Sequence, residues 1–116
     1  MKHSIGKSLP AGATTEVFTV PAGYVAEVTL LFITNHTASN KTVSAYWQHA
    51  HDPSHQIYIV QGKTISAKDF LMLTDAAMVM QSGDSLHITT EAGGDFAVIT
   101  TFDLRKETAL YTFAGE

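Results

Sequence analysis

Hydrophobic and polar residues alternate in short runs along the chain, and turn-forming residues interrupt these runs at intervals of about ten positions. The runs are rich in Val, Ile, Thr, Phe and Tyr, which are the residues that favour β-strands. No run of useful length has the period of a helix, so the pattern is typical of an all-β sandwich or barrel. It predicts about eight strands, over residues 15–20, 24–35, 42–49, 57–60, 64–74, 78–80, 86–91 and 96–104.

The longest predicted strand, over residues 24–35, is apolar on both faces for part of its length. Its even positions from Tyr24 to Phe32 are all apolar, whereas its odd positions become apolar only at Leu31 and Ile33. Successive side chains of a strand point to opposite faces of the sheet. We therefore expect one face to be buried throughout, and the other to be covered toward the far end by a partner or a neighbouring subunit.

The length and composition predict a single domain over residues 1–116. A chain of 116 residues with 45% hydrophobic content can bury a core that holds the fold without disulfides or metals. The two ends of the sequence lie outside the predicted strands. We therefore expect a β-sandwich with an N-terminal arm of about residues 1–13 and a C-terminal arm of about residues 106–116.

Charge and cysteine content exclude several classes of function. The net charge is −4 with seven Lys and Arg residues, so the chain lacks the clustered cations that nucleic-acid binding needs. Cysteine is absent, which excludes disulfides and thiolate metal sites. No segment has the length of a membrane span, and the first residues lack the apolar region of a secretory signal. We therefore expect synthesis and folding in a cytoplasm, with no membrane or nucleic acid as partner.

A histidine-rich stretch, "WQHAHDPSHQ" at residues 47–56, is the one candidate for metal chemistry. An H-x-H pair on a strand aims two imidazoles the same way, so His49, His51 and His55 are the candidate ligands. The spacing differs from that of metallo-β-lactamase-like hydrolases, for which the chain is also too short. It differs from cupins because the flanking glycines and a following Glu are missing. The favoured interpretation is a polar loop, marked by Pro53, and no cofactor is predicted.

The sequence contains no recognisable catalytic motif. The stretch "QSGDS" places a serine beside a glycine but lacks the nucleophile elbow of a hydrolase. Gly93-Gly94 resembles a hairpin turn, because no helix follows it to hold a phosphate. We therefore expect a protein that is not an enzyme.

Aromatic and apolar residues near the C-terminus are candidates for an interface. Leu110, Tyr111 and Phe113 follow the last predicted strand. They form either a ninth strand on the chain's own sheet or an arm that docks on a neighbouring subunit, since exposed aromatic residues mark interfaces. Tyr46 and Trp47, on opposite faces of the predicted strand 42–49, are the other two candidate anchors.

The segment "VFTVPAGYVAEVTLLFITN", residues 17–35, resembles small accessory structural proteins of tailed bacteriophages. In these proteins a strand leads through a P-A-G turn into a long strand that ends in Asn, and a later S-G-D turn precedes another strand. Here the S-G-D turn is Ser82-Gly83-Asp84, and the resemblance covers roughly residues 15–104. It implies a β-sandwich or jelly-roll protein of the virion, with no catalytic residues to carry over.

The resemblance implies a capsid decoration (cement) protein at the capsid surface. Such proteins bind as homotrimers to the major capsid protein and clamp adjacent subunits. One alternative is a tail or head-fibre sandwich that binds a host-surface carbohydrate through Trp47 or Tyr58. A second alternative is a small cupin-like metalloprotein that uses His49, His51 and His55.

Overall fold

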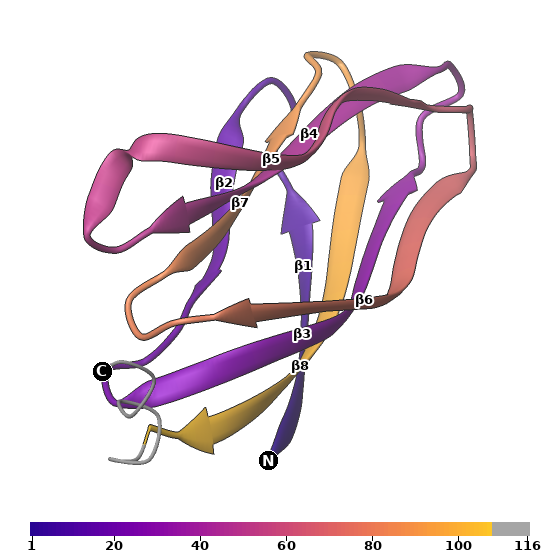
Figure 1. Ribbon diagram of the computed structural model, residues 1–116. Coiled ribbons are helices and arrows are strands. Elements are labelled where there is room, and N and C mark those ends of the chain that lie inside the picture. The colour runs from indigo at the N-terminus through magenta and orange to yellow at the C-terminus, as the bar shows by residue number, and fades with distance from the viewer. Residues whose placement is uncertain (108–116) are drawn as a thin grey trace.

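The computed structural model describes residues 1–107, with all their side chains except those of Pro53 and residues 75–77. The chain forms two four-stranded antiparallel sheets that pack face to face (Figure 1). The predicted all-β sandwich is therefore confirmed. Its strands are β1 (Lys2–Leu9), β2 (Thr14–Thr19), β3 (Tyr24–Asn35), β4 (Lys41–His49), β5 (Asp52–Ile65), β6 (Phe70–Met80), β7 (Ser85–Thr90) and β8 (Phe96–Lys106).

The strand order is that of a jelly roll. Sheet A has the order β1-β8-β3-β6, and sheet B has the order β2-β7-β4-β5. The chain crosses between the sheets at every connection except the β4–β5 hairpin, which gives the doubled Greek key of this architecture. Within residues 1–107 no helix is long and apolar enough to cross a membrane.

The core lies between the two sheets and takes side chains from both. The Phe18 ring of β2 stacks on the Phe102 ring of β8 across the interlayer space, at 4.5 Å between ring centroids. Burial of this apolar surface is the main term that stabilises the fold. Sheet A contributes Leu31, Ile33, Val98 and Phe96, and sheet B contributes Val17, Val43, Leu86 and Ile88, all of them fully buried.

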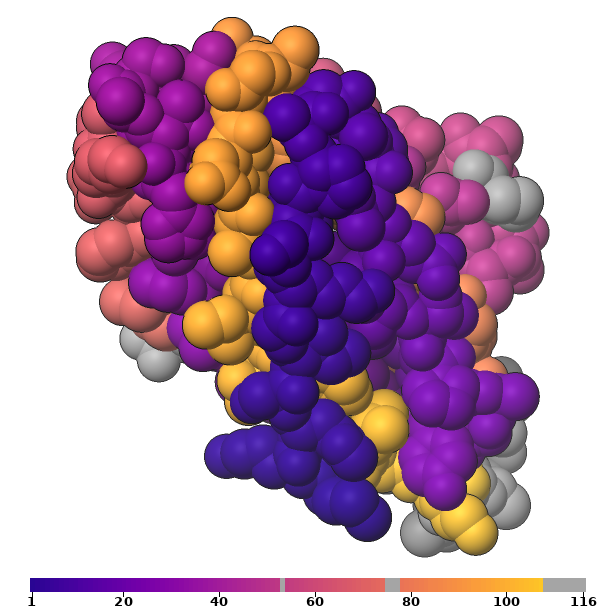
Figure 2. Space-filling view, turned by 180° about the vertical axis from the view of Figure 1, so that it is seen from behind, coloured from indigo at the N-terminus to yellow at the C-terminus, as the bar shows by residue number. Residues whose placement is uncertain are grey.

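The N-terminal residues are a strand of the sandwich and not an arm. Residues 2–9 pair with β8 over the whole length of β1, and Figure 2 shows β1 (indigo) lying against β8 (orange to yellow). Leu9 is buried and Ile5 packs against the core, so alternate residues of β1 extend the inner face of sheet A. The expected arm over residues 1–13 is therefore wrong. The expected C-terminal arm lies almost wholly outside the described residues.

A β-bulge in β3 explains why this strand is apolar on both faces. The pairing of β3 with β6 and with β8 shifts register between Val28 and Leu30. Ala26 and Val28 point into the core before the bulge, and Leu31 and Ile33 do so after it. The even positions therefore do not form one continuous buried face. The side chains at even positions beyond Thr29 point away from the core.

The strand β5 is longer than the sequence predicts, and the next turn comes later. The predicted turn at residues 61–63 is wrong, because Gly62 adopts a φ of 62° inside β5 at a register shift opposite Val43 and Ala45. Gly62 N donates to Ser44 Oγ, so the bulge stays bonded to β4. The chain turns instead at residues 66–69, where Asp69 N donates to Ser66 O.

The P-A-G and S-G-D turns pack against each other at one end of the sandwich. Gly23 (φ 83°) and Gly83 (φ 85°) occupy the positive-φ position of their turns, which glycine adopts without strain. Gly83 N donates to Val20 O, and Gly23 N donates to Ser82 Oγ. A Cβ atom on Gly83 would lie 2.7 Å from that of Ala50, so the site also needs glycine for space.

Candidate functional site

The outer face of sheet A carries a contiguous apolar patch. Phe32 of β3 lies directly between Met72 of β6 and Ile99 of β8 in the sheet register. Opposed residues of neighbouring strands share a face, so these three side chains form one row pointing away from the core. We define the sheet A patch as this row and its two apolar neighbours on the same face, namely Leu30, Phe32, Phe70, Met72 and Ile99.

The largest side chains of the patch are open to solvent. Phe70, Met72 and Ile99 expose 52%, 51% and 43% of their surface, and the rings of Phe32 and Phe70 lie 5.1 Å apart. Gly6 of β1 lies opposite Ile99 and leaves that flank uncovered, because it has no side chain. A cluster of this kind on a small domain is unusual unless another molecule covers it.

The residues paired in register with the patch on its described border are polar threonines. Thr34, Thr74 and Thr101 are paired in register with members of the patch. Ser4 and Thr101 share a hydrogen bond between their hydroxyl groups at 2.9 Å, so this rim is already ordered. An apolar centre with a neutral polar rim is the composition of a protein–protein interface core.

Charged groups lie farther along the same face. Lys2, Glu27 and Asp103 belong to one row of the register near the N-terminal end of β3. The N-terminal amine of Met1 donates to Asp103 Oδ1 at 2.7 Å, and this hydrogen bond lowers the pKa of the Asp103 carboxyl. A partner that covers the patch therefore meets an acidic and basic border on this side.

Tyr46 and Trp47 lie where the alternation of β4 predicts, but neither is an exposed anchor. Trp47 points inward, packs against the core, and donates from Nε1 to Asp84 Oδ2 at 3.0 Å. Tyr46 points outward on sheet B, yet only 7% of it is exposed, because Tyr58 and His87 flank its ring. Their role as interface residues stays a prediction. The other three proposed anchors, Leu110, Tyr111 and Phe113, lie outside the described residues.

A second row, on the outer face of sheet B, combines aromatic and titratable groups. Glu16, His87, Tyr46 and Tyr58 follow one another across four strands. The His87 and Tyr46 rings stack at 4.8 Å, and His87 Nε2 shares a hydrogen bond with Ser85 Oγ. Burial lowers the pKa of His87, an effect that the nearby Glu16 carboxylate partly opposes. Burial also raises the pKa of Tyr46, to which Tyr58 adds.

The His87→Phe substitution is expected to reduce the loss of stability on acidification. The pKa of His87 is lower in the folded chain than the ordinary histidine value of 6.5, so the unfolded chain takes up this proton first as the pH falls. The stabilisation is therefore present above that value and is lost below it. Phenylalanine keeps a ring beside Tyr46 and does not titrate. Thermal unfolding between about pH 5 and 8 measures the effect.

His55→Gln, which changes an exposed histidine, is the control. If the melting temperatures of the two variants change equally with pH, the prediction is contradicted.

The histidine-rich stretch is a tight hairpin and not a long loop. β4 ends at His49 and β5 begins at Asp52, so only Ala50 and His51 lie between the two strands. His49 Nδ1 is buried 3.7 Å from Asp84 Oδ2, whereas His55 Nδ1 lies 3.6 Å from Asp52 Oδ2. Among the side chains that the structure describes, no group of three or more His, Asp or Glu is arranged to hold a metal ion. The three candidate ligands are thus not brought together around one point.

Comparison with known sequences gives no assignment, because no protein-family model and no curated protein matches the chain. Comparison with solved structures identifies the fold. The chain is similar to one in the structure of the infectious bursal disease virus Gx strain, with a TM-score of 0.51 and 12% identity over 93% of this chain. A chain of the T13 IBDV viral particle gives a TM-score of 0.51 and 10% identity over 91% of this chain. The present chain spans only 38% and 35% of the length of those two chains.

A solved structure of PirA is similar over nearly its whole length. Its TM-score is 0.53, with 12% identity over 86% of this chain and 93% of PirA. Identities of 10–12% show a shared fold alone. The same sandwich thus occurs both as one part of a longer virus-particle chain and as nearly all of another protein.

Proposed function

We propose that this chain is a structural protein of a virion, and specifically a capsid decoration protein that binds neighbouring subunits through the sheet A patch. The observation that carries the proposal is the exposure of Phe70, Met72 and Ile99 in one uncharged cluster on a regular sheet face. The jelly-roll order of the strands and the fold shared with infectious bursal disease virus chains support it. The bacteriophage-like turn motifs at residues 21–23 and 82–84 agree with this fold.

The proposed partners are the major capsid protein and two further copies of this chain. A homotrimer at the capsid surface presents three patches at once, so each contact strengthens the others by raising the effective concentration of the next. An interface of standard size buries about 1,600 Å², of which the patch supplies the apolar centre and its threonine rim the border. The chain is synthesised in the host cytoplasm and joins the particle there.

The double substitution Phe70→Ser and Met72→Ser is expected to weaken binding to particles by about tenfold or more. Truncation of a central interface side chain commonly costs more than 1 kcal/mol, and 1.4 kcal/mol corresponds to a factor of ten in affinity. Particles are purified from cells that produce either form of the chain, and mass spectrometry measures how much of it remains with the particles. Sedimentation velocity of the purified chain measures whether the trimer is also lost.

Tyr58→Ser is the matched control for this experiment. Tyr58 is a large side chain with 42% of its surface exposed, but it lies on sheet B, away from the patch. The control is expected to co-purify with particles as the unaltered chain does. If the unaltered chain never accompanies particles, the virion role is wrong. If both variants bind equally well, the patch is not the contact surface.

The exposure of Tyr58 favours a second candidate, a tail or head-fibre sandwich that binds carbohydrate. Sugars stack on exposed aromatic rings beside polar groups, and Tyr58 is next to Gln56, whose Oε1 is 3.5 Å from the tyrosine hydroxyl. Trp47 does not serve this role, because its indole points into the core. The same two variants separate the candidates on a glycan array. Carbohydrate binding that Tyr58→Ser abolishes and the sheet A variant leaves intact would favour the second candidate.

A further inference from the structure

The strand β6 forms one edge of sheet A, and among the described residues only β3 pairs with it (Figure 1). Residues 70–74 pair with β3 in an unbroken register, from Phe70 opposite Thr34 to Thr74 opposite Leu30. β5, the edge strand of the facing sheet, pairs with β4 alone. The other side of residues 70–74 is therefore an uninterrupted strand edge without a described neighbour.

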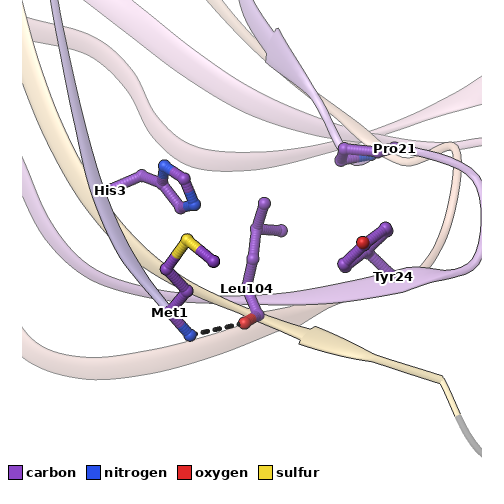
Figure 3. Close-up of a pocket in the computed structure, with 5 residues that line it drawn as sticks. All are labelled: Met1, His3, Pro21, Tyr24 and Leu104. Carbon is purple, nitrogen blue, oxygen red and sulfur yellow. Dashed lines mark hydrogen bonds between the residues drawn. The ribbon is translucent and has the colours of Figure 1, made fainter.

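A half-open pocket lies at the other end of β3 and does not include this edge. Figure 3 shows the residues that line it, which are Met1, His3, Pro21, Tyr24 and Leu104. Tyr24 is the first residue of β3, whereas residues 70–74 pair with residues 30–34 of the same strand. The edge of β6 is thus a separate surface of the molecule.

The main-chain groups of this edge are directed to accept a further strand. Asn35 N donates to Asp69 O, at the position next to the paired segment. Bonded and non-bonded pairs alternate along an antiparallel ladder, so the N–H and C=O groups of Phe70, Met72 and Thr74 point away from β3. The Phe70 amide agrees with this assignment, because it donates to Asp69 Oδ1 at 2.8 Å. These three residues present the donors and acceptors that another strand can bond.

The edge lacks the features by which exposed strand edges normally avoid pairing, namely charges, prolines and bulges. Residues 70–74, with the sequence Phe-Leu-Met-Leu-Thr, contain no charge, no proline and no register shift. The other edge strands do have such features. β1 carries Lys7, β2 shifts register between Glu16 and Phe18, and β5 shifts register against β4 at three places. The first half of β6 is therefore the unprotected edge.

Both faces of the segment have apolar side chains that are incompletely covered. Leu71 and Leu73 lie opposite the fully buried Ile33 and Leu31, so they face the core, yet they are only partly buried. The outer residues of the segment belong to the sheet A patch. A strand placed beside β6 therefore covers apolar surface on both faces of the sheet, which stabilises the contact in addition to the main-chain hydrogen bonds.

We propose that two copies of this chain pair through residues 70–74 of β6, antiparallel about a two-fold axis at Met72, which joins their A sheets into one continuous sheet. The segment is complementary to itself, since Leu71 then lies opposite Leu73 of the second copy and Met72 lies opposite its own counterpart. No charge opposes this pairing. The central row of the sheet A patch continues through Met72 into the same row of the second copy, so the two patches form one surface.

This contact is distinct from the homotrimer of the proposed function, and it does not depend on the virion role. Two-fold symmetry joins copies in pairs, so on a particle the contact links one trimer to the next. A ladder of five residues is small beside a standard interface of about 1,600 Å². We therefore expect reversible association, which a covalent bond across the axis traps.

Single cysteines test the contact and its register, because the chain contains no cysteine. Opposed residues of an antiparallel pair have Cα atoms about 4.5–5.5 Å apart, a separation that a disulfide spans. Met72→Cys is therefore expected to form a disulfide-linked dimer under mild oxidation about tenfold faster or more than Thr74→Cys. Thr74 is exposed on the same face, but the proposed axis places it roughly 14 Å from Thr74 of the second copy.

A mixture of Phe70→Cys chains and Thr74→Cys chains checks the register, because the proposed axis sets these two positions opposite each other. The mixture is expected to form a mixed dimer faster than either variant forms a dimer alone. Fast Met72→Cys dimers together with the mixed dimer support the proposal. Fast Met72→Cys dimers without the mixed dimer overturn it, as does Ile99→Cys reacting as readily as Met72→Cys, which indicates patches packed face to face. Equally slow reaction of all variants also overturns it.

Leu73→Lys provides a second measurement that leaves the sheet A patch unaltered. An inward-pointing lysine on an edge strand is a common barrier to pairing, so this substitution in the Met72→Cys chain is expected to slow dimer formation by about tenfold or more. Thr64→Lys, which adds the same charge to the edge strand β5, is the control, and circular dichroism verifies that both variants are folded. Equal rates of dimer formation in the two variants overturn the proposal. Absence of the unaltered chain from particles, in contrast, contradicts only the virion role.

Discussion

Replacing Asp84 with alanine is expected to lower the free energy of unfolding by about 3–5 kcal/mol. The Asp84 carboxylate is fully buried and accepts three hydrogen bonds. The donors are Trp47 Nε1, Ala50 N and Gln81 N, at 3.0, 3.0 and 2.9 Å. Alanine removes the acceptor of all three part-buried donors, and a donor left unpaired away from water costs about 1–3 kcal/mol. The free energy of unfolding of a single domain is only about 5–15 kcal/mol, so the Asp84 side chain accounts for a large part of it.

Chemical denaturation followed by far-UV circular dichroism measures this loss. Fluorescence alone is a poor probe, since Trp47, the single tryptophan, is itself bonded to Asp84. Asp95→Ala, which removes an exposed carboxylate, is the control and is expected to change stability by no more than about 0.5 kcal/mol. Asp84→Asn keeps one acceptor oxygen, so its stability is expected to lie between the other two variants. Equal stabilities of Asp84→Ala and Asp95→Ala would contradict the assigned role.

The alternation of apolar residues predicted most of the strands, because a sandwich buries one face of each strand and leaves the other in water. β4 is the clearest case. Val43 and Ala45 are buried in the core, and Ser44 and Gln48 lie on the outer face as the pattern predicts. The turns at residues 21–23 and 82–84 were also predicted, since both need glycine at a positive φ.

The prediction failed where the structure departs from the usual turn residues. Lys68 occupies the left-handed position of the real turn at residues 66–69, with a φ of 57°, although a bulky side chain is rare there. Gly62, which carried the signal for a turn, instead forms a bulge inside β5. β1 was missed because only Ile5 and Leu9 of its inner-face positions are apolar, whereas His3 and Lys7 interrupt the alternation.

The sheet A patch could be found only in part from the sequence. The two-sided apolar character of β3 predicted that a partner would cover one of its faces. The residues on the outer face of β3 were misassigned, because a bulge reverses the alternation after Val28. The residues at the bulge are not of a type that predicts one. Met72 lies in one row with Phe32 and Ile99, and Phe70 lies beside that row, only through pairings between strands far apart in the chain. The register in which β6 and β8 pair with β3 cannot be deduced from a single sequence.

Asp84 and Asn35, two residues of the bacteriophage-like motifs, form hydrogen bonds that connect loops at opposite ends of the sandwich. Asp84 joins the β6–β7 turn to the β4–β5 hairpin at one end. Asn35, the last residue of β3, joins the β3–β4 loop to the β5–β6 turn at the other. The side chains of both residues form hydrogen bonds between loops that are distant in the sequence. Their presence therefore indicates the fold and not a binding site.

Replacing Asn35 with alanine is accordingly expected to lower the free energy of unfolding by about 2–4 kcal/mol. The Asn35 amide is buried and uses both of its polar atoms. Nδ2 donates to the carbonyl oxygens of Ser39, Ile65 and Ser66 at 3.0–3.2 Å. Oδ1 accepts from Thr37 N at 2.9 Å. Alanine leaves the carbonyl oxygen of Ile65 in a buried position without the donor that Asn35 supplies.

The matched control is Asn40→Ala, which removes an exposed amide that accepts a hydrogen bond from Ala67 N in the same region. It is expected to cost no more than about 1 kcal/mol, because water replaces the lost acceptor. Asn35→Asp tests whether the donated hydrogen bonds matter. Aspartate has the same shape as asparagine, but its carboxylate cannot donate to the three carbonyl oxygens. At neutral pH it should be at least as unstable as Asn35→Ala. It should recover relative to Asn35→Ala as the pH falls through the range in which the buried carboxyl takes up a proton and can donate again. A pH-independent difference between these two variants would show that the cavity, and not the donated hydrogen bonds, determines the loss.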